Sequence, residues 1–283
     1  MPQILSTFVA AALATGLALS LPLVNLVRGN ENTTPSKKIN AVILSGGHPF
    51  EQAAFLKVFQ HEGITYKHVV QKQGGEVFEN IAPWPYDVIV LYNFKQEISP
   101  RQQENFVKLL EKGVGLVILH HAVAAYVDWP LYKEIAGVQY HTRPWELGGK
   151  AMPASDYKHG VTFKVDIADP GHPIAAGLTD FEIVDETYRG SSCSPAVRPM
   201  LTTDEPSSDP IIGFVKTYGN ARVCYLQPGH GRTAYENPSY RTLVVRAIRW
   251  TAGQKETRSG HSERSEASTF PASAGQILCG RSG

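Results

Sequence analysis

The chain has 283 residues, of which 42% are hydrophobic and 19% charged, and its formal net charge is +1. This composition suits one large or two small globular domains, and without a cluster of Lys and Arg it argues against a nucleic-acid partner. The three cysteines form no CxxC pair and are odd in number, so we expect neither a zinc ribbon nor a disulfide scaffold.

The chain begins with an apolar segment. Residues 4–27 are almost wholly hydrophobic, and the first basic residue, Arg28, lies behind them. The run is nearly long enough to span a bilayer, and it lacks the positively charged start of a secretory signal. We expect a signal peptide or membrane anchor over residues 1–28 and a polar linker over residues 29–38. The protein would then be exported to the periplasm or the exterior, either free or held at the membrane by residues 4–27.

Strands and helices alternate in the first half of the domain that follows. Helical spacing of apolar residues predicts one helix over residues 51–61 and another from Ser99-Pro100 to Gly113. Short turns join these helices to strands, which predicts a parallel sheet with right-handed crossovers. The run at residues 114–119 is apolar throughout, as in a strand buried in the middle of such a sheet. The predicted strands span residues 39–44, 64–70, 87–92 and 114–119.

The second half of the domain has a different pattern. A short helix is predicted at residues 129–136, and residues 161–167 alternate as a half-exposed strand does. His172 stands in a turn, which we expect it to brace. A closing amphipathic helix is predicted over residues 240–250, and the polar tail of residues 254–283 is expected to be disordered. Further predicted strands span residues 181–184, 200–203, 211–216 and 222–226.

Histidines follow three of the predicted strands. His48 comes after two glycines, His120 and His121 follow the central strand, and His230 stands between two glycines. Ligands of open α/β sheets bind at the carboxyl ends of the strands, so we expect these imidazoles to line one crevice. Successive side chains of a strand point to opposite faces, so His120 and His121 can share the crevice only if the chain bends between them. Otherwise one of the two is a hydrogen-bonded core residue.

A carboxylate beside these imidazoles would allow two mechanisms. The first uses a divalent metal, with zinc as the first expectation. The second is metal-free proton transfer, with Glu186 or His230 as the base and His120 as the acid or oxyanion donor. A binding site without turnover is the third alternative. We take His120, Glu186 and His230 as the catalytic group, and the metal would be held by some of His48, His120, His121, His141, Glu186 and His230.

The surroundings of these residues suit a carbohydrate. Aromatic side chains offer flat apolar faces to sugar rings, and charged side chains can hydrogen-bond the hydroxyl groups, although each aromatic could equally pack in the core. No GxGxxG or GxxxxGK pattern is present, and Pro49 removes a backbone donor, so no nucleotide or flavin is expected. The candidate substrate-binding residues are His48, Arg143, Trp145, Glu146, Tyr188, Arg232 and Tyr235.

Five short motifs occur in order along the chain: Leu119-His120-His121-Ala122, Gly171-His172-Pro173-Ile174, Asp185-Glu186-Thr187-Tyr188, Tyr218-Gly219-Asn220-Ala221-Arg222 and Pro228-Gly229-His230. Together they resemble the trehalose-utilisation (ThuA-like) family over residues 39–253. The resemblance implies a flavodoxin-like α/β fold related to class I glutamine amidotransferases: a mostly parallel sheet with helices on both faces, and additional antiparallel strands in the second half. It also implies a role in the use of trehalose and related, oxidised disaccharides.

The glutamine amidotransferases carry a cysteine on the elbow after the central strand, and here His120 occupies that position. No cysteine lies near it in the sequence, so the resemblance does not imply thiol chemistry. We expect an exported enzyme that hydrolyses a disaccharide or keto-sugar or transfers a proton on it. The alternative is a non-catalytic sugar-binding or accessory module that uses the same crevice.

Overall fold

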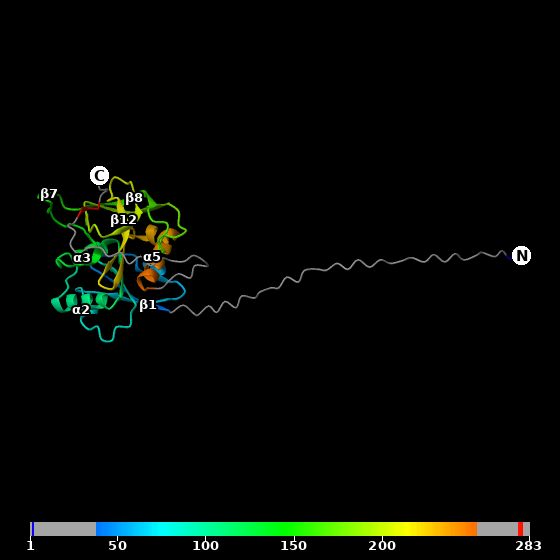
Figure 1. Cartoon of the computed structure of the whole chain (residues 1–283), viewed down its shortest axis with the longest axis horizontal. Coiled ribbons are helices and arrows are strands. Elements are labelled where there is room, and N and C mark those ends of the chain that lie inside the picture. The colour runs from blue at the N-terminus through cyan, green and yellow to red at the C-terminus, as the bar shows by residue number, and fades with distance from the viewer. Residues whose placement is uncertain (1, 3–37, 254–276, 280–283) are drawn as a thin grey trace. The chain divides into compact units, whose positions relative to one another are not determined.

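The computed structural model describes residues 38–253 and 277–279, together with Pro2. The domain is built on a nine-stranded sheet in the order β2-β1-β3-β4-β13-β12-β11-β8-β9 (Figure 1). Five neighbouring strands run parallel to one another: β2 (Ile64–Val70), β1 (Ile39–Gly46), β3 (Val88–Asn93), β4 (Gly115–Leu119) and β13 (Ala221–Leu226).

The other four strands are antiparallel to their neighbours and extend the sheet beyond β13. They are β12 (Ile211–Tyr218), β11 (Arg198–Thr202), β8 (Asp156–Ile167) and β9 (Phe181–Arg189). The predicted α/β fold is therefore confirmed, with a parallel sheet formed by the first half and antiparallel strands added by the second.

Both faces of the parallel strands are covered by helices, which explains why β4 is apolar at every position. Alternate side chains of this strand enter two separate cores, with Val117 and Leu119 in one and Leu116 and Ile118 in the other. The first core packs against α5 (Pro238–Thr251), α1 (Gln52–Leu56) and the 3₁₀ turn η1 (Lys57–Phe59). The second packs against α2 (Pro100–Glu111) and α3 (Tyr132–Ala136), and Figure 1 shows α3 and α5 on either side of the strands.

Helix α2 begins at the residue that the sequence predicts. The Ser99 hydroxyl accepts the Gln102 N–H at 3.3 Å, and the Gln102 side chain accepts the Ser99 N–H at 2.9 Å. This reciprocal cap satisfies two backbone donors that a helix start leaves free. The helix predicted over residues 51–61 is shorter, because α1 tightens into η1 and ends at Phe59. The remaining short elements include η2 (Glu76–Phe78), η3 (His120–Ala124), β5 (Val138–Gln139), β6 (Trp145–Leu147), β7 (Lys150–Met152) and α4 (Arg232–Glu236).

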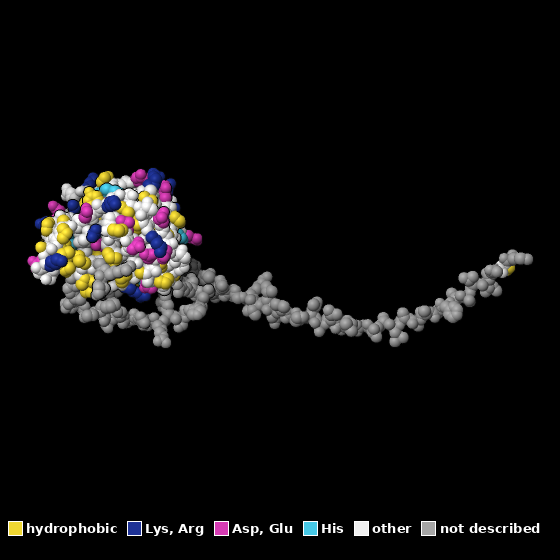
Figure 2. All heavy atoms as spheres, turned by 90° about the horizontal axis from the view of Figure 1, so that it is seen from above, with side chains coloured by type: hydrophobic (Ala, Val, Ile, Leu, Met, Phe, Trp, Pro, Cys, Tyr) yellow, Lys and Arg dark blue, Asp and Glu magenta, His cyan; other side chains and the backbone are white. Residues whose placement is uncertain are grey.

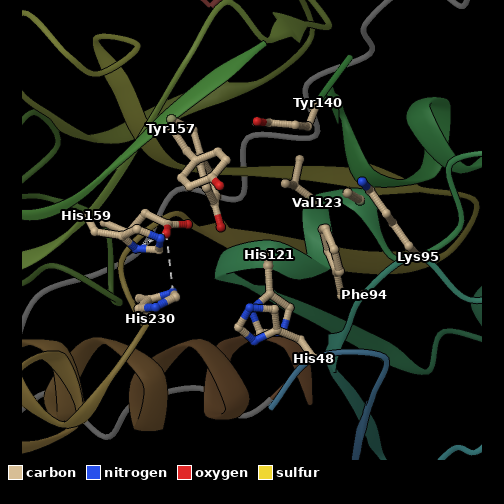
Figure 3. Close-up of a pocket in the computed structure, with 12 residues that line it drawn as sticks. His48, Phe94, Lys95, His121, Val123, Tyr140, Tyr157, His159 and His230 are labelled. Carbon is tan, nitrogen blue, oxygen red and sulfur yellow. Dashed lines mark ion pairs between the residues drawn. The ribbon is translucent and has the colours of Figure 1, made fainter. Parts of the chain in front are cut away.

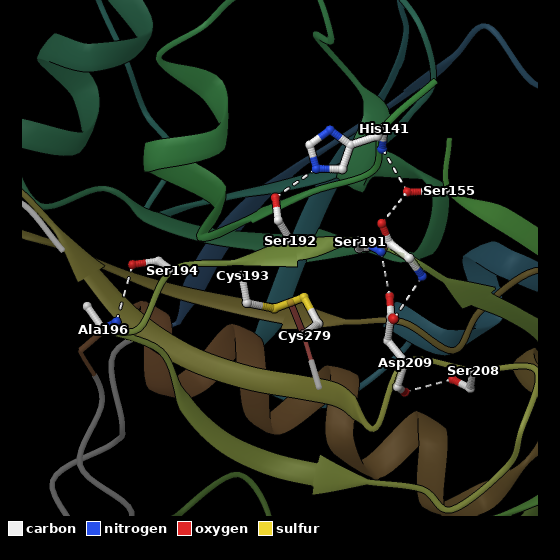
Figure 4. The surroundings of a disulfide bond; sticks show 11 residues. His141, Ser155, Ser191, Ser192, Cys193, Ser194, Ala196, Ser208, Asp209 and Cys279 are labelled. Carbon is white, nitrogen blue, oxygen red and sulfur yellow. Dashed lines mark hydrogen bonds between the residues drawn. A yellow bond between two sulfur atoms is a disulfide. The ribbon is translucent and has the colours of Figure 1, made fainter. Parts of the chain in front are cut away.

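A disulfide bond joins Cys193 to Cys279 (Figure 4). It ties β14 (Ile277–Leu278) to β10 (Ser192–Cys193), and β10 also pairs with β5 in a separate three-stranded sheet. Nothing in the sequence indicated this single bond, because the odd cysteine count reflects one buried free thiol, Cys224, beside a bonded pair. The expectation of disorder throughout the tail is wrong at residues 277–279, and the rest of the tail lies outside the described residues.

The N-terminal signal or anchor segment and most of the linker also lie outside the described residues. Within the described part of the chain, no helix combines the length and apolar character needed to cross a membrane. Figure 2 shows Lys and Arg interspersed with Asp and Glu on the face that it displays. In the turn before β9, the Ile174 N–H donates to His172 Nδ1 at 3.2 Å, which confirms the predicted bracing role of His172.

Candidate active site

Three strand ends bring their histidines together at one edge of the sheet. His48 follows β1, His120 opens η3 directly after β4, and His230 follows β13. The ring centroid of His230 lies 5.1 Å from that of His120 and 5.7 Å from that of His48. The predicted convergence of these imidazoles is confirmed. It follows from the parallel pairing of β1, β3, β4 and β13, which aligns their carboxyl ends.

The adjacent histidines also share this region, because the strand ends just before them and both lie in η3. His120 has a φ angle of +51°, in the left-handed region that few residues other than glycine adopt. This turn stops the alternation of an extended strand and brings His121 to within 4.8 Å of His48, measured between ring centroids. His121 Nε2 donates a hydrogen bond to the Tyr92 carbonyl oxygen, with 3.1 Å between the two atoms.

Strand β9 adds a carboxylate to the imidazoles. Glu186 Oε1 lies 3.4 Å from His120 Nε2, and its Oε2 lies 3.5 Å from His230 Nδ1. His120 Nε2 and His230 Nδ1 are themselves 3.1 Å apart. Asp185 points to the opposite side of the strand, where its carboxylate accepts the backbone N–H groups of Gly229 and His230. Of these two neighbouring carboxylates, Glu186 is the one that faces the imidazoles.

A backbone carbonyl fixes the tautomer of His120. Its Nδ1 lies 2.7 Å from the Gln227 oxygen, which can only accept, so Nδ1 carries the hydrogen. In the neutral ring, Nε2 then presents a lone pair toward Glu186 and His230. The Tyr188 hydroxyl donates to this nitrogen at 2.8 Å.

Burial and neighbouring charges set the protonation states of the cluster. Burial alone would raise the pKa of Glu186, but its interaction with the neighbouring His120, followed by the charge of His230, lowers it to about 2. Burial, and then the charge of His120, lowers the pKa of His230 to about 4, although Glu186 acts in the opposite direction. At neutral pH the cluster therefore combines an ionised carboxylate with a neutral His230.

Glu186 and His230 of this cluster line a cavity of about 260 Å³ (Figure 3), whereas His120 is fully buried and is not among its lining residues. His48 and His121 line the same cavity. Lys95 is the one lysine or arginine among its described lining residues. The volume is at the small end for ligand pockets. The full lining consists of His48, Phe94, Lys95, His121, Val123, Ala124, Tyr140, Tyr157, His159, Glu186, Tyr188 and His230.

Comparison with known protein families decides the affiliation of the chain. Residues 40–251 match the model of the ThuA family, described as trehalose utilisation. The chain belongs to the ThuA family. A search among curated proteins finds no match to this ThuA protein.

Solved structures show the same fold. A ThuA-like protein from Parabacteroides merdae superposes with a TM-score of 0.64 at 19% identity, covering 79% of this chain and 93% of that one. A ThuA-like protein from Bacteroides uniformis gives a TM-score of 0.56 at 19% identity, with 81% and 97% covered. A cytoplasmic protein from Salmonella typhimurium superposes with a TM-score of 0.53 at 12% identity, covering 75% of this chain and 99% of that one.

The cavity of this ThuA protein includes residues that the sequence did not indicate. His159 Nδ1 lies 2.5 Å from Glu186 Oε2, and Tyr157 lines the wall beside it. The ladder between β8 and β9 is interrupted between Lys158 and Val161, which leaves His159 opposite Glu186 at an irregular step. Tyr157 and His159 are two residues apart, a spacing that places both side chains on one face of a strand. The sequence did not indicate this, because the predicted strand began only at residue 161.

Several candidate residues lie outside this cavity, although His48, His121 and Tyr188 line it. His141 stacks on Trp145, with 3.8 Å between ring centroids, and bonds the Ser192 hydroxyl, so it is not in the metal-binding position suggested by the sequence. Tyr235 is buried and shares a 2.5 Å hydrogen bond with Tyr92. Three charged candidates lie at the surface, where they pair with other side chains or face solvent: Arg143, Glu146 and Arg232.

Proposed function

We propose that this ThuA protein is a metal-dependent enzyme that acts on a carbohydrate. His120 Nε2, the Glu186 carboxylate and His230 Nδ1 would hold one divalent ion, with zinc as the expected metal. A single observation carries the proposal. Donors from β9 and from the segments that follow β4 and β13 meet within 3.1 to 3.5 Å of one another.

The spacing of the donors fits coordination better than direct hydrogen bonding. Bonds of about 2.1 Å at a tetrahedral angle set neighbouring ligands about 3.4 Å apart. The two imidazole–carboxylate separations, 3.4 and 3.5 Å, are long for charge-assisted hydrogen bonds, which are usually below 3 Å. Two histidines and one carboxylate are also a ligand set of catalytic zinc sites, which keep a further position for water or substrate.

The groups behind the donors support the same role. A metal-bound histidine usually donates its other ring N–H to a carbonyl or carboxylate, as His120 Nδ1 does to the Gln227 carbonyl. Asp185 holds the backbone of His230 through the His230 N–H. His159 contacts the second carboxylate oxygen of Glu186 and would keep that group oriented.

The cavity supplies the rest of the chemistry. A bound divalent ion would polarise a sugar oxygen or activate a water molecule. His159 is more than half exposed beside Glu186, where its imidazole can exchange a proton with a ligand in the cavity. Phe94 and Tyr188 offer aromatic surface to a sugar ring. Together with the family's link to trehalose utilisation, these groups favour hydrolysis of a sugar or proton transfer on it.

We also propose that the protein is exported. The Cys193–Cys279 bond supports this location, because disulfides persist in the periplasm and outside the cell but are rare in the cytosol.

Turnover assays test the enzymatic proposal. Trehalose and its 3-keto derivative are incubated with zinc-loaded protein, with chelated protein and with His120→Ala, and the products are separated by chromatography. We expect chelation and His120→Ala to lower the rate at least about a hundredfold. His61→Ala, which alters an exposed histidine on the α5 side, is the matched control and should keep the full rate.

The other outcomes distinguish the rival interpretations. Binding of either sugar without consumption by any form of the protein would support a non-catalytic binding module. A rate unaffected by chelation and by added zinc would support metal-free proton transfer.

A further inference from the structure

A second cavity of about 350 Å³ lies beside the candidate active site. Its walls come from Val127 and Asp128, just after η3, and from the segment of residues 139–145. Tyr140 lines both cavities, so the two hollows meet at one side chain. A ligand larger than one ring could therefore occupy both.

The second cavity contains side chains that suit a sugar ring. Trp145 is half buried and lines the cavity, and its ring stacks on His141 with an interplanar angle of 1°. Arg143 and Asp128 stand at the rim, 3.9 Å apart, with most of both side chains exposed. An indole face packs against the C–H groups of a sugar, while a guanidinium and a carboxylate bond neighbouring hydroxyls as donor and acceptor.

The charges of this cavity favour a neutral ligand over a phosphorylated one. Arg143 and Asp128 offset each other, and no other Lys, Arg, Asp or Glu is among the described lining residues. Burial, and then the charge of Lys133, lowers the pKa of His141 to about 4, so its ring is neutral near pH 7.

The Trp145 side chain is held in place by its stack on His141, which lines the same cavity. Trp145 belongs to the β6–β7 hairpin, which forms a two-stranded sheet of its own. A hairpin of this kind has little stability by itself, so the stack on His141 is an important anchor. His141 in turn bonds the Ser192 hydroxyl at 2.8 Å, on the strand that carries the disulfide (Figure 4).

We propose that this second cavity is a subsite for the second ring of an uncharged disaccharide, with the link between the rings passing over Tyr140. The inference rests on the proposed function, because it assumes that the first ring occupies the cavity beside Glu186. It adds where the second ring of a disaccharide binds, namely against Trp145 and Arg143.

Calorimetric titration of chelated protein, in which turnover should be at least about a hundredfold slower, tests the subsite with two probes. Trehalose can fill both cavities, whereas methyl α-glucoside can fill one. We expect the wild type to bind trehalose at least about tenfold more tightly. Trp145→Ala should remove most of this difference while leaving the dissociation constant of methyl α-glucoside within about twofold.

Three further variants make the result specific. Trp145→Phe keeps an aromatic face and should restore part of the preference for trehalose. Arg143→Ala alters an exposed side chain, so it should fold normally and weaken trehalose binding alone. Lys150→Ala, on the same hairpin but outside the lining of both cavities, is the matched control and should bind both probes as the wild type does.

The outcomes separate the subsite from the function on which it rests. Binding of methyl α-glucoside with no tighter binding of trehalose, or equal weakening of both probes by Trp145→Ala and Arg143→Ala, overturns the subsite and leaves the carbohydrate site intact. Failure of both probes to bind overturns the carbohydrate site and the subsite with it.

Discussion

The buried carboxylate of Asp185 accepts the backbone N–H of His230 at 3.0 Å. Its second oxygen accepts the Gly229 N–H at 2.5 Å, so one side chain holds the loop that carries the histidine. Glu186, the next residue of β9, faces His120 and His230 from the other side of the strand. A single strand therefore supplies one carboxylate to the candidate metal site and another to its support.

Replacing Asp185 should therefore weaken metal binding without removing a ligand. In Asp185→Asn, an amide NH₂ replaces one of two acceptor oxygens and faces a backbone donor. We expect zinc affinity to fall about 10- to 100-fold and the free energy of unfolding to fall by about 2 kcal/mol. Competition with a chromophoric chelator and urea titration would measure the two effects.

Asp209→Asn is the matched control for that variant. Asp209 is also buried, and its carboxylate accepts the N–H groups of Gly190 and Ser191, both at 2.9 Å. It should lose similar stability and keep its zinc affinity. Equal losses of zinc affinity in the two variants would show that Asp185 has no specific role in the site.

The disulfide predicts a distinct pattern of thiol labelling. In denatured, unreduced protein, iodoacetamide should modify Cys224 alone, and after reduction it should also modify Cys193 and Cys279. Peptide mass spectrometry gives the positions. Modification of all three cysteines without reductant, in protein from an oxidising compartment, would contradict the bond.

Loss of the disulfide should also destabilise the fold. The bond closes a loop of 86 residues, for which the chain-entropy model gives about 4.6 kcal/mol. We expect Cys193→Ser to lower the free energy of unfolding in urea by an amount of this order. Reductant should then have little further effect on the variant, although it destabilises the wild type.

Stability should fall in mild acid partly because of His172. Burial, followed by the charge of Arg198, lowers the pKa of His172 to about 4, whereas an unfolded histidine titrates near 6.5. Between these values the unfolded chain binds a proton that the folded chain does not, so stability is lost as the pH falls from about 6.5 to 4. The contribution approaches about 3 kcal/mol at the lower end.

Urea titrations across this pH range compare the wild type with His172→Asn. An asparagine oxygen can accept the Ile174 N–H in the same turn, so the variant should fold and show a shallower loss of stability in acid. His61→Asn, at an exposed position, should follow the wild type. Parallel curves for all three proteins would contradict the assignment to His172.

The sequence predicted the sheet best where strands are buried and paired in parallel. The run at residues 64–70 coincides with β2, and the apolar run before His120 corresponds to β4, because strands covered on both faces are apolar throughout. The meeting of His48, His120 and His230 also followed from topology, since parallel strands end at a common edge.

Features set by long-range pairing could not be read from local patterns. His159 reaches Glu186 only through an irregular step between β8 and β9. Cys279 reaches Cys193 from a polar tail, across a separation of 86 residues. Arg232 and Tyr235 follow His230 closely in the sequence, yet their side chains bond Glu51 and Tyr92 instead of lining the cavity.

Zinc titration of the protein, purified without a histidine tag and stripped with a chelator, tests the central claim most directly. Elemental analysis after removal of free metal should give about one zinc per chain for the wild type and for His61→Ala, and much less for His230→Ala and Glu186→Gln. Less than about a tenth of an equivalent in the wild type after soaking, or equal zinc in all four proteins, would contradict a metal site formed by His120, Glu186 and His230.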